Sequence, residues 1–214
     1  MSESRVMKFL ALHGKQQNGG VFRKRLGRLP HKCKKYCSLN ILEAPFVVKE
    51  EDRMGTIEGE PKTWFYRNKE TLVVDLASLE ETMSFVQQEW DSASASGEPY
   101  NGILGFSQGG TLTGMICQYP ERFPGIEAVI CIGSPDNALI EKVNIAKYTG
   151  LKALHLAGAT DSIVPTESSK NLSEKFNEDT TDFQMHEQGH CIPSRAEQQK
   201  VIVDFIAEVA SGSI

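Results

Sequence analysis

The stretch Gly102-Ile103-Leu104-Gly105-Phe106-Ser107-Gln108-Gly109-Gly110 decides the fold class of this chain. Its centre, residues 105–109, reads G-x-S-x-G. The apolar run before Ser107 predicts a buried strand, and the residues after it have apolar side chains at helical spacing, namely Leu112, Met115, Ile116 and Tyr119. A serine at a sharp strand-to-helix turn adopts a strained backbone that exposes its hydroxyl. This context favours a nucleophile over the alternative, an N-capping serine in a glycine-rich turn.

Short apolar runs alternate with amphipathic segments on both sides of this stretch. Strands are predicted at residues 6–12, 39–44, 102–106, 127–132, 152–157 and 182–186. Helices are predicted at residues 21–37 (kinked or divided by Pro30), 75–90, 110–119, 166–176 and 195–209. The alternation predicts one α/β domain over residues 1–214, with a mostly parallel sheet and helices on both faces.

Two segments depart from this plain alternation. The helix at 21–37 has a strongly basic side, interpreted as a solvated face, formed by Arg23, Lys24, Arg25, Arg28, Lys32, Lys34 and Lys35. Residues 49–70 are charged, contain glycines and then become aromatic, without clear periodicity. We interpret this second segment as a lid or rim insertion. Its aromatic residues Trp64 and Phe65, together with Phe106, are candidates for lining a substrate pocket.

Composition narrows the class of protein. The 214 residues have a net charge of −5, which argues against a general nucleic-acid binder. No apolar run approaches the about 20 residues that a membrane span needs. The first residues have no signal-peptide pattern, and the five cysteines are an odd number. We therefore expect a cytoplasmic protein with reduced thiols. No feature selects an oligomeric state.

A serine nucleophile needs a base that is itself oriented by a carboxylate. In hydrolases with this turn, the chain order is serine, acid, histidine. His190 follows Gly189 on a loop past the last predicted strand, and we expect it to be the general base. His155 lies within an apolar strand and is interpreted as a hydrogen-bonded packing histidine, while His186 closes a strand.

The acid is expected to be Asp161. It follows the predicted strand 152–157 through a short turn, at the strand's carboxyl end and before the histidine strand. Asp136 competes because it also follows a strand, but one strand earlier. Asp182 begins a strand and would lie at the opposite edge of the sheet.

The loop after the first strand, His13-Gly14-Lys15-Gln16-Gln17-Asn18-Gly19, can contribute to an oxyanion hole. We expect the Lys15 amide to act beside the Gln108 amide, which begins the helix after Ser107. His13 is expected to brace the loop. Asn18 is expected to orient the loop, to contact the substrate, or to be an ordinary turn residue.

No metal site is expected. His186-Glu187-Gln188-Gly189-His190 matches H-E-x-x-H, but that signature holds zinc only on a helix, and here it spans a predicted strand end. His31, Cys33 and Cys37 lack a fourth ligand at a standard spacing.

Several stretches together resemble one family. They are Tyr100–Leu112 (YNGILGFSQGGTL), His13–Asn18, Phe22–Arg25, Ala44–Phe46, Trp64-Phe65, Asp161–Pro165 and Gly189–Pro193. In this order they resemble the small hydrolases of the fungal family-of-serine-hydrolases group, which includes the ovarian-cancer-associated gene 2 esterases. Gly110-Thr111 and Gln188 depart locally, where alanines and a second glycine are common.

The resemblance implies an α/β-hydrolase fold with Ser107, Asp161 and His190 as the triad. It also implies hydrolysis of a small-molecule carboxylic ester without a cofactor. A thioesterase or peptidase can use the same residues. A non-catalytic binding module on this scaffold is a further alternative, although such a module has no need of all three residues.

Overall fold

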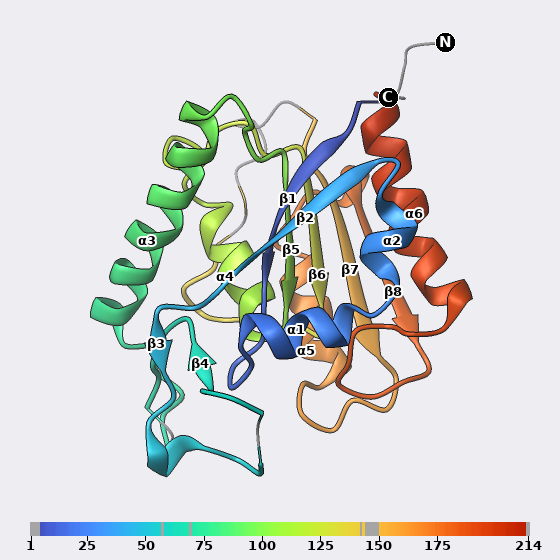
Figure 1. Cartoon of the computed structure of the whole chain (residues 1–214). Coiled ribbons are helices and arrows are strands. Elements are labelled where there is room, and N and C mark those ends of the chain that lie inside the picture. The colour runs from blue at the N-terminus through green and yellow to red at the C-terminus, as the bar shows by residue number, and fades with distance from the viewer. Residues whose placement is uncertain (1–4, 57, 69, 142, 144–149, 213–214) are drawn as a thin grey trace.

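Six parallel strands form the central sheet of the computed structural model, which describes residues 5–56, 58–68, 70–141, 143 and 150–212 (Figure 1). The strands lie in the order β2-β1-β5-β6-β7-β8, and every pair is parallel. Their bounds are β1 Met7–Leu12, β2 Cys37–Leu42, β5 Gly102–Phe106, β6 Ala128–Ile132, β7 Lys152–Gly158 and β8 Thr181–His186. All six predicted strands are confirmed, with ends that differ by up to two residues.

The strand order positions the site. The chain goes from β1 outward to β2 and later returns to the other side of β1 as β5. Ligands of open α/β sheets bind beyond the carboxyl ends of the strands where the order reverses in this way. The loop after β1 and the turn after β5 meet at this position. Both strands are almost entirely buried, because each is covered on two faces.

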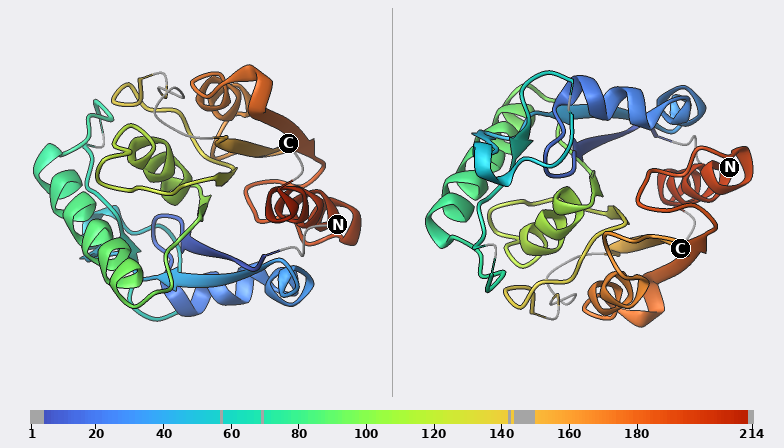
Figure 2. Two further views of the ribbon diagram at one scale, coloured as in Figure 1. Left: turned by 90° about the horizontal axis from the view of Figure 1, so that it is seen from above. Right: turned by 90° about the horizontal axis from the view of Figure 1, so that it is seen from below.

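Helices cover both faces of the sheet (Figure 2). Helices α1 (Gly19–Leu26), α2 (Leu29–Cys33) and α6 (Ala196–Ser211) enclose one apolar core. Helices α3 (Leu76–Ala95), α4 (Gln108–Ile116) and α5 (Thr166–Ser173) enclose the other. This arrangement confirms the predicted doubly covered sheet. No helix among the described residues is both long and apolar enough to cross a membrane.

The helix predicted over 21–37 is divided and shorter than expected. Gly27 ends α1 with a φ of 54°, a conformation that glycine adopts without strain. Pro30 lies in the first turn of α2, where its missing N–H costs no helical hydrogen bond. Cys37 belongs to β2 rather than to the helix.

Residues 49–70 contain more structure than the sequence suggested. A short 3₁₀ helix, η1 (Glu50–Asp52), precedes β4 (Lys62–Thr63), which pairs with β3 (Phe46–Val47) in a small antiparallel sheet. Figure 1 shows this pair beyond the carboxyl ends of the central strands. Trp64 and Phe65 then turn into the core, where Thr82 of α3 donates a hydrogen bond to the Trp64 carbonyl. The segment is thus anchored in the core at its aromatic end, and we refer to its described residues as the rim.

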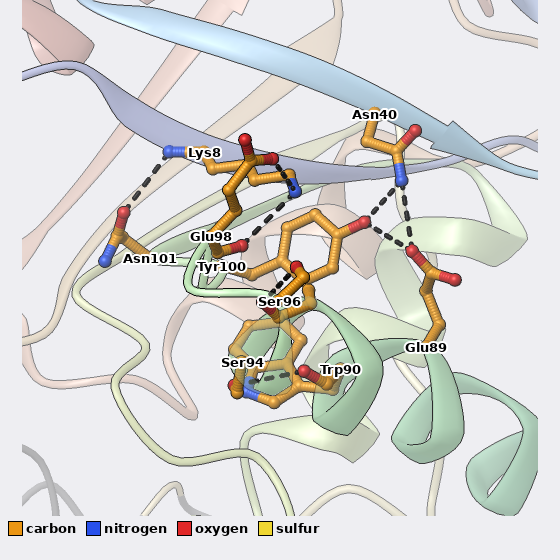
Figure 3. Close-up of polar contacts among 10 residues, drawn as sticks. Lys8, Asn40, Glu89, Trp90, Ser94, Ser96, Glu98, Tyr100 and Asn101 are labelled. Atoms are coloured by element: carbon orange, nitrogen blue, oxygen red, sulfur yellow. Dashed lines mark hydrogen bonds and ion pairs between the residues drawn. The ribbon is translucent and has the colours of Figure 1, made fainter.

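A polar network lies at the opposite, amino-terminal side of the sheet, between β1, β2, α3 and the residues just before β5 (Figure 3). The buried Tyr100 hydroxyl donates to Glu89 at 2.6 Å and accepts from Asn40. Burial and the Glu89 hydrogen bond raise the pKa of Tyr100, so the phenol remains a donor. Lys8 pairs with Glu98 at 3.1 Å beside the same ring.

Replacing Tyr100 with phenylalanine is expected to lower the free energy of unfolding by about 1 kcal/mol, because one donor and one acceptor are lost in a partly solvated network. Urea unfolding measures this change. The reactivity expected of the Ser107 hydroxyl should stay at the wild-type value, because the network lies far from the Ser107 end of the strands. A large fall in that reactivity would contradict this separation.

His155 differs from its interpretation as a hydrogen-bonded histidine at one of its two ring nitrogens. It is buried on β7 against the Phe176 ring, with centroids 5.0 Å apart, and among the described residues its Nε2 has no hydrogen-bond partner. Burial lowers the pKa of His155 to about 3. Both ring nitrogens of His186 are likewise buried without a hydrogen-bond partner among the described residues, and burial lowers the pKa of His186 too.

Acid is therefore expected to destabilise the fold through His155. An unfolded histidine titrates near pH 6.5, so between about pH 6.5 and pH 3 the unfolded chain binds a proton that the folded chain does not. The free energy of unfolding then falls by up to about 1.4 kcal/mol per pH unit as the pH drops. His155→Leu is expected to lower this slope by the contribution of one proton, because leucine binds none in either state. Urea unfolding at several pH values measures the slope. His31→Gln, which removes a histidine at an exposed position, is the matched control variant.

Candidate active site

Ser107 lies in the turn between β5 and α4, in a conformation that few non-glycine residues adopt. Its φ is 53° and its ψ is −120°. The Ser107 amide donates to the Ile132 carbonyl at 2.9 Å, and the Ser107 carbonyl accepts from the Gly110 and Thr111 amides. Neighbouring backbone from β6 and α4 therefore holds the strained residue in place.

The two glycines of the motif allow α4 to approach the sheet. A Cβ on Gly105 would lie 2.5 Å from the Gly109 carbonyl oxygen. A Cβ on Gly109 would lie 2.2 Å from the Leu12 carbonyl oxygen at the end of β1. Both clashes are with backbone, which cannot rotate away. Gly110 is similarly closed, because a Cβ there would overlap the Ser134 hydroxyl. The family resemblance suggested an alanine at position 110. In this chain the space for its Cβ is filled by the Ser134 hydroxyl.

His190 joins Ser107 to Asp161. The His190 Nε2 lies 3.0 Å from the Ser107 Oγ, and its Nδ1 lies 2.7 Å from the Asp161 Oδ2. The Asp161 side chain is 2% exposed and that of His190 12% exposed. The other Asp161 oxygen, Oδ1, accepts from the Ile163 and Val164 amides at 2.9 and 2.8 Å. The carboxylate is thereby fixed in both position and rotation.

Loop-to-loop contacts keep Asp161 and His190 in register. The Ala159 amide donates to the His186 carbonyl at 2.7 Å. The segment after β7, which contains Asp161, is therefore bonded to the end of β8, from which the His190 loop begins. Gln188, where the family resemblance suggested a glycine, closes its own loop through Ser194. The Gln188 Nε2 donates to the Ser194 Oγ, and the Ser194 amide donates to the Gln188 Oε1, both at 3.1 Å.

The competing candidates lie elsewhere. Asp136 forms an ion pair with Lys175 at 2.8 Å. Asp182 lies near the start of β8. His186 ends β8, so the H-E-x-x-H stretch spans a strand end and a loop rather than a helix.

Gly133 is a site residue that the sequence analysis missed. It follows β6 with a φ of 54°, and a Cβ there would lie 3.2 Å from the His190 Nδ1. Phe106 lies against the same imidazole, with ring centroids 4.9 Å apart. The only sequence signal for Gly133 was a glycine directly after a predicted strand.

The loop after β1 is braced from inside. The buried His13 accepts at Nε2 from the Ala44 amide at 3.1 Å, which leaves its Nδ1 to donate to the Gly14 carbonyl at 2.9 Å. Burial lowers the pKa of His13 and keeps this neutral form. The Gly14 amide donates to the Gln17 side chain at 3.0 Å. Lys15 thus sits in a compact turn beside Ser107, and both line one cavity.

Gln108 connects the start of α4 to the rim. As the first residue of the helix, its amide is among those with no intrahelical acceptor. Its side-chain oxygen accepts from the Thr63 hydroxyl and the Trp64 amide, and its side-chain nitrogen donates to the Phe65 carbonyl, all within 2.9–3.0 Å. The aromatic end of the rim therefore fixes the helix terminus next to Ser107.

A cavity of about 620 Å³ opens beside Ser107 and His190, a size suited to a small ligand. Its apolar lining consists of Val21, Met54, Phe106 and Ile163, and its charged lining of Lys15, Lys24, Arg25 and Glu58. Phe106 thus lies where the sequence analysis expected a pocket residue. Lys24 and Arg25, interpreted from sequence as part of a solvated helix face, border this cavity.

The other predicted pocket residues, Trp64, Phe65 and Asn18, are not among the residues that line this cavity. Trp64 is fully buried and donates from its indole to the His13 carbonyl at 2.7 Å, and Phe65 is buried in the same core, so the expectation that they line the pocket was wrong. Asn18 caps α1 by accepting from the Val21 amide at 2.9 Å. Its side-chain nitrogen donates to the Glu58 and Glu60 carbonyls, so Asn18 orients the rim.

Two curated relatives align in sequence with nearly the whole of this chain. Esterase OVCA2 of Xenopus tropicalis is 29% identical over 96% of this chain and 94% of its own length. Human esterase OVCA2 is 25% identical over 98% of this chain and all of its own length.

Solved structures at low identity show the same α/β-hydrolase fold. Acyl-protein thioesterase 2 of Zea mays has a TM-score of 0.70 at 14% identity, covering 98% of this chain and 96% of its own. The Bacillus cereus carboxylesterase has a TM-score of 0.68 at 16% identity, covering 96% and 90%. The family model described as serine hydrolase (FSH1) matches residues 1–202. Since that match covers nearly the whole chain, the protein belongs to the FSH1 serine hydrolase family.

Proposed function

We propose that this serine hydrolase cleaves a small-molecule carboxylic ester through an acyl-enzyme on Ser107. The observation that carries the proposal is the hydrogen-bonded chain from Ser107 Oγ through His190 to Asp161, with distances of 3.0 and 2.7 Å. Such a chain lets a neutral imidazole accept a proton from the hydroxyl while the carboxylate stabilises the resulting cation.

In the first half-reaction, His190 Nε2 takes the Ser107 proton as Oγ bonds to the ester carbonyl carbon. The negative oxygen of the tetrahedral intermediate is held by the amides of Gln108 and Lys15. When the intermediate collapses, the bond to the alcohol oxygen breaks and His190 returns its proton to that oxygen. Ser107 then carries the acyl group.

In the second half-reaction, water attacks the acyl-enzyme while His190 takes a proton from it. Collapse of the second tetrahedral intermediate breaks the bond to Ser107 Oγ, which regains its proton from His190. The carboxylic acid leaves. The steps need water and the residues of this chain, and no cofactor takes part in the proposed reaction.

A fluorophosphonate probe tests the nucleophile. Ser107 Oγ is expected to displace fluoride from phosphorus, giving one covalent adduct per chain that mass spectrometry can locate on Ser107. The Ser107→Ala variant should not react, while Ser162→Ala, an exposed serine next to Asp161, should react like the wild type. Labelling that survives in Ser107→Ala would remove Ser107 from the mechanism. Turnover of matched ester, thioester and amide substrates separates esterase from thioesterase and peptidase activity.

A further inference from the structure

The α1 wall of the cavity bears positive charge that is only partly neutralised. Lys24 and Arg25 both line the cavity. The Lys24 ammonium is held by both carboxylate oxygens of Glu58 on the rim, at 2.5 and 2.7 Å. Arg25 is exposed, and within the described ranges it forms no ion pair with a carboxylate. Arg25 is therefore a cavity-lining residue whose positive charge no carboxylate among the described residues neutralises.

The guanidinium lies on the same side as the reacting residues. Arg25, Ser107 and His190 border one cavity. Burial raises the pKa of the Cys191 thiol, and the charge of Arg25 opposes that rise, which requires Arg25 to be within electrostatic range of the residue after His190. An anion bound by Arg25 would thus lie in the same cavity as an ester bond at Ser107.

The apolar part of the cavity lining suits a short apolar chain. Val21, Met54 and Phe106 line the cavity together with the exposed Ile163. A planar guanidinium can bind a carboxylate through two parallel hydrogen bonds, which gives both energy and orientation. A fully neutral ester would leave this charge without a partner and gain nothing from it.

We propose that the substrate is an ester carrying a carboxylate a short apolar chain away from the scissile bond, and that Arg25 binds this carboxylate. The inference rests on the proposed esterase function, because it assigns the substrate class of that same site. Arg25 acts as a binding residue, so its contribution is expected mainly in KM.

Matched esters test the proposal. One pair is the mono-4-nitrophenyl ester of adipic acid and the corresponding ester of its monoamide, which differ only by carboxylate against carboxamide. A second pair, phenyl butyrates with a para-carboxylate or a para-carboxamide, places the anion on the alcohol side. In at least one pair we expect about tenfold higher kcat/KM for the anion, since a charge-assisted hydrogen bond of this kind supplies about one factor of ten. The preference should weaken as salt is added.

Arg25→Gln is expected to bring the ratio of kcat/KM within the preferred pair close to one by raising KM for the anionic ester alone. Arg23→Gln is the matched control, because Arg23 is exposed on the same helix and is not among the lining residues of the cavity. Arg25→Glu should reverse the preference toward an ester with a terminal ammonium group. Equal turnover within both pairs by the wild-type enzyme would overturn the anion preference alone. Absence of turnover and of fluorophosphonate labelling would instead overturn the proposed function.

Discussion

Asp161→Asn is expected to lower kcat for ester hydrolysis by about four orders of magnitude while the protein stays folded. The reason lies in the two amides that bind Oδ1 at 2.9 and 2.8 Å. In asparagine, the side-chain oxygen must occupy that position, because an NH₂ group cannot accept hydrogen bonds from two N–H groups. The NH₂ group then faces the His190 Nδ1.

This orientation forces the wrong tautomer on His190. The Nδ1 becomes an acceptor, so the proton sits on Nε2, which points at Ser107 Oγ and can no longer take its proton. The fold should survive with a loss of only about 1–2 kcal/mol, since both hydrogen bonds to the side-chain oxygen remain. Steady-state kinetics and urea unfolding measure the two quantities.

Two further variants sharpen the Asp161 test. Asp136→Asn is the matched control, because Asp136 also follows a strand of the sheet but pairs with Lys175, so turnover should be retained. The double variant Ser107→Ala/Asp161→Asn should be no slower than Ser107→Ala, as residues that act as one unit are not additive. An Asp161→Asn enzyme with more than about a tenth of wild-type kcat would be inconsistent with this orienting role.

The sequence was sufficient for the parts of the structure that depend on local pattern. The alternation of apolar runs with amphipathic segments predicted all six strands. The motif around Ser107 predicted a tight turn, and neighbouring backbone atoms indeed leave no room for a Cβ on Gly105 or Gly109. The parallel sheet then brings together residues that each follow a strand, which is why loop position and chain order together could predict that Asp161 and His190 lie near Ser107.

The rim could not be predicted because its conformation depends on distant partners. The sequence predicted that Trp64 and Phe65 line a pocket. In the structure both are buried in the core, where their backbone is hydrogen-bonded to the side chain of Gln108, 43 to 44 positions later. The same holds for Arg25, whose place beside the cavity depends on how α1 packs against the rim, through contacts such as Lys24 with Glu58. Contacts of this kind leave no periodic signal in the sequence.

Gly109→Ala is expected to lower the free energy of unfolding by at least about 4 kcal/mol and to abolish turnover. The new Cβ would lie 2.2 Å from the Leu12 carbonyl oxygen and 2.7 Å from that of His13, so α4 would have to leave β1 and take Ser107 with it.

Gly97→Ala separates this backbone clash from the conformational cost of losing a glycine. Gly97 has a φ of 79° and open space around its Cβ position, so alanine there should cost only about 1–2 kcal/mol and leave turnover intact. Gly114→Ala adds a control on α4 itself, because the nearest described atoms to its Cβ would be side-chain methyl groups of Ile140 and Leu172, each at 3.0 Å, rather than backbone. Urea unfolding ranks the three variants. If Gly109→Ala unfolds with the same free energy as Gly97→Ala, the close contact between α4 and β1 is not what requires glycine at this position.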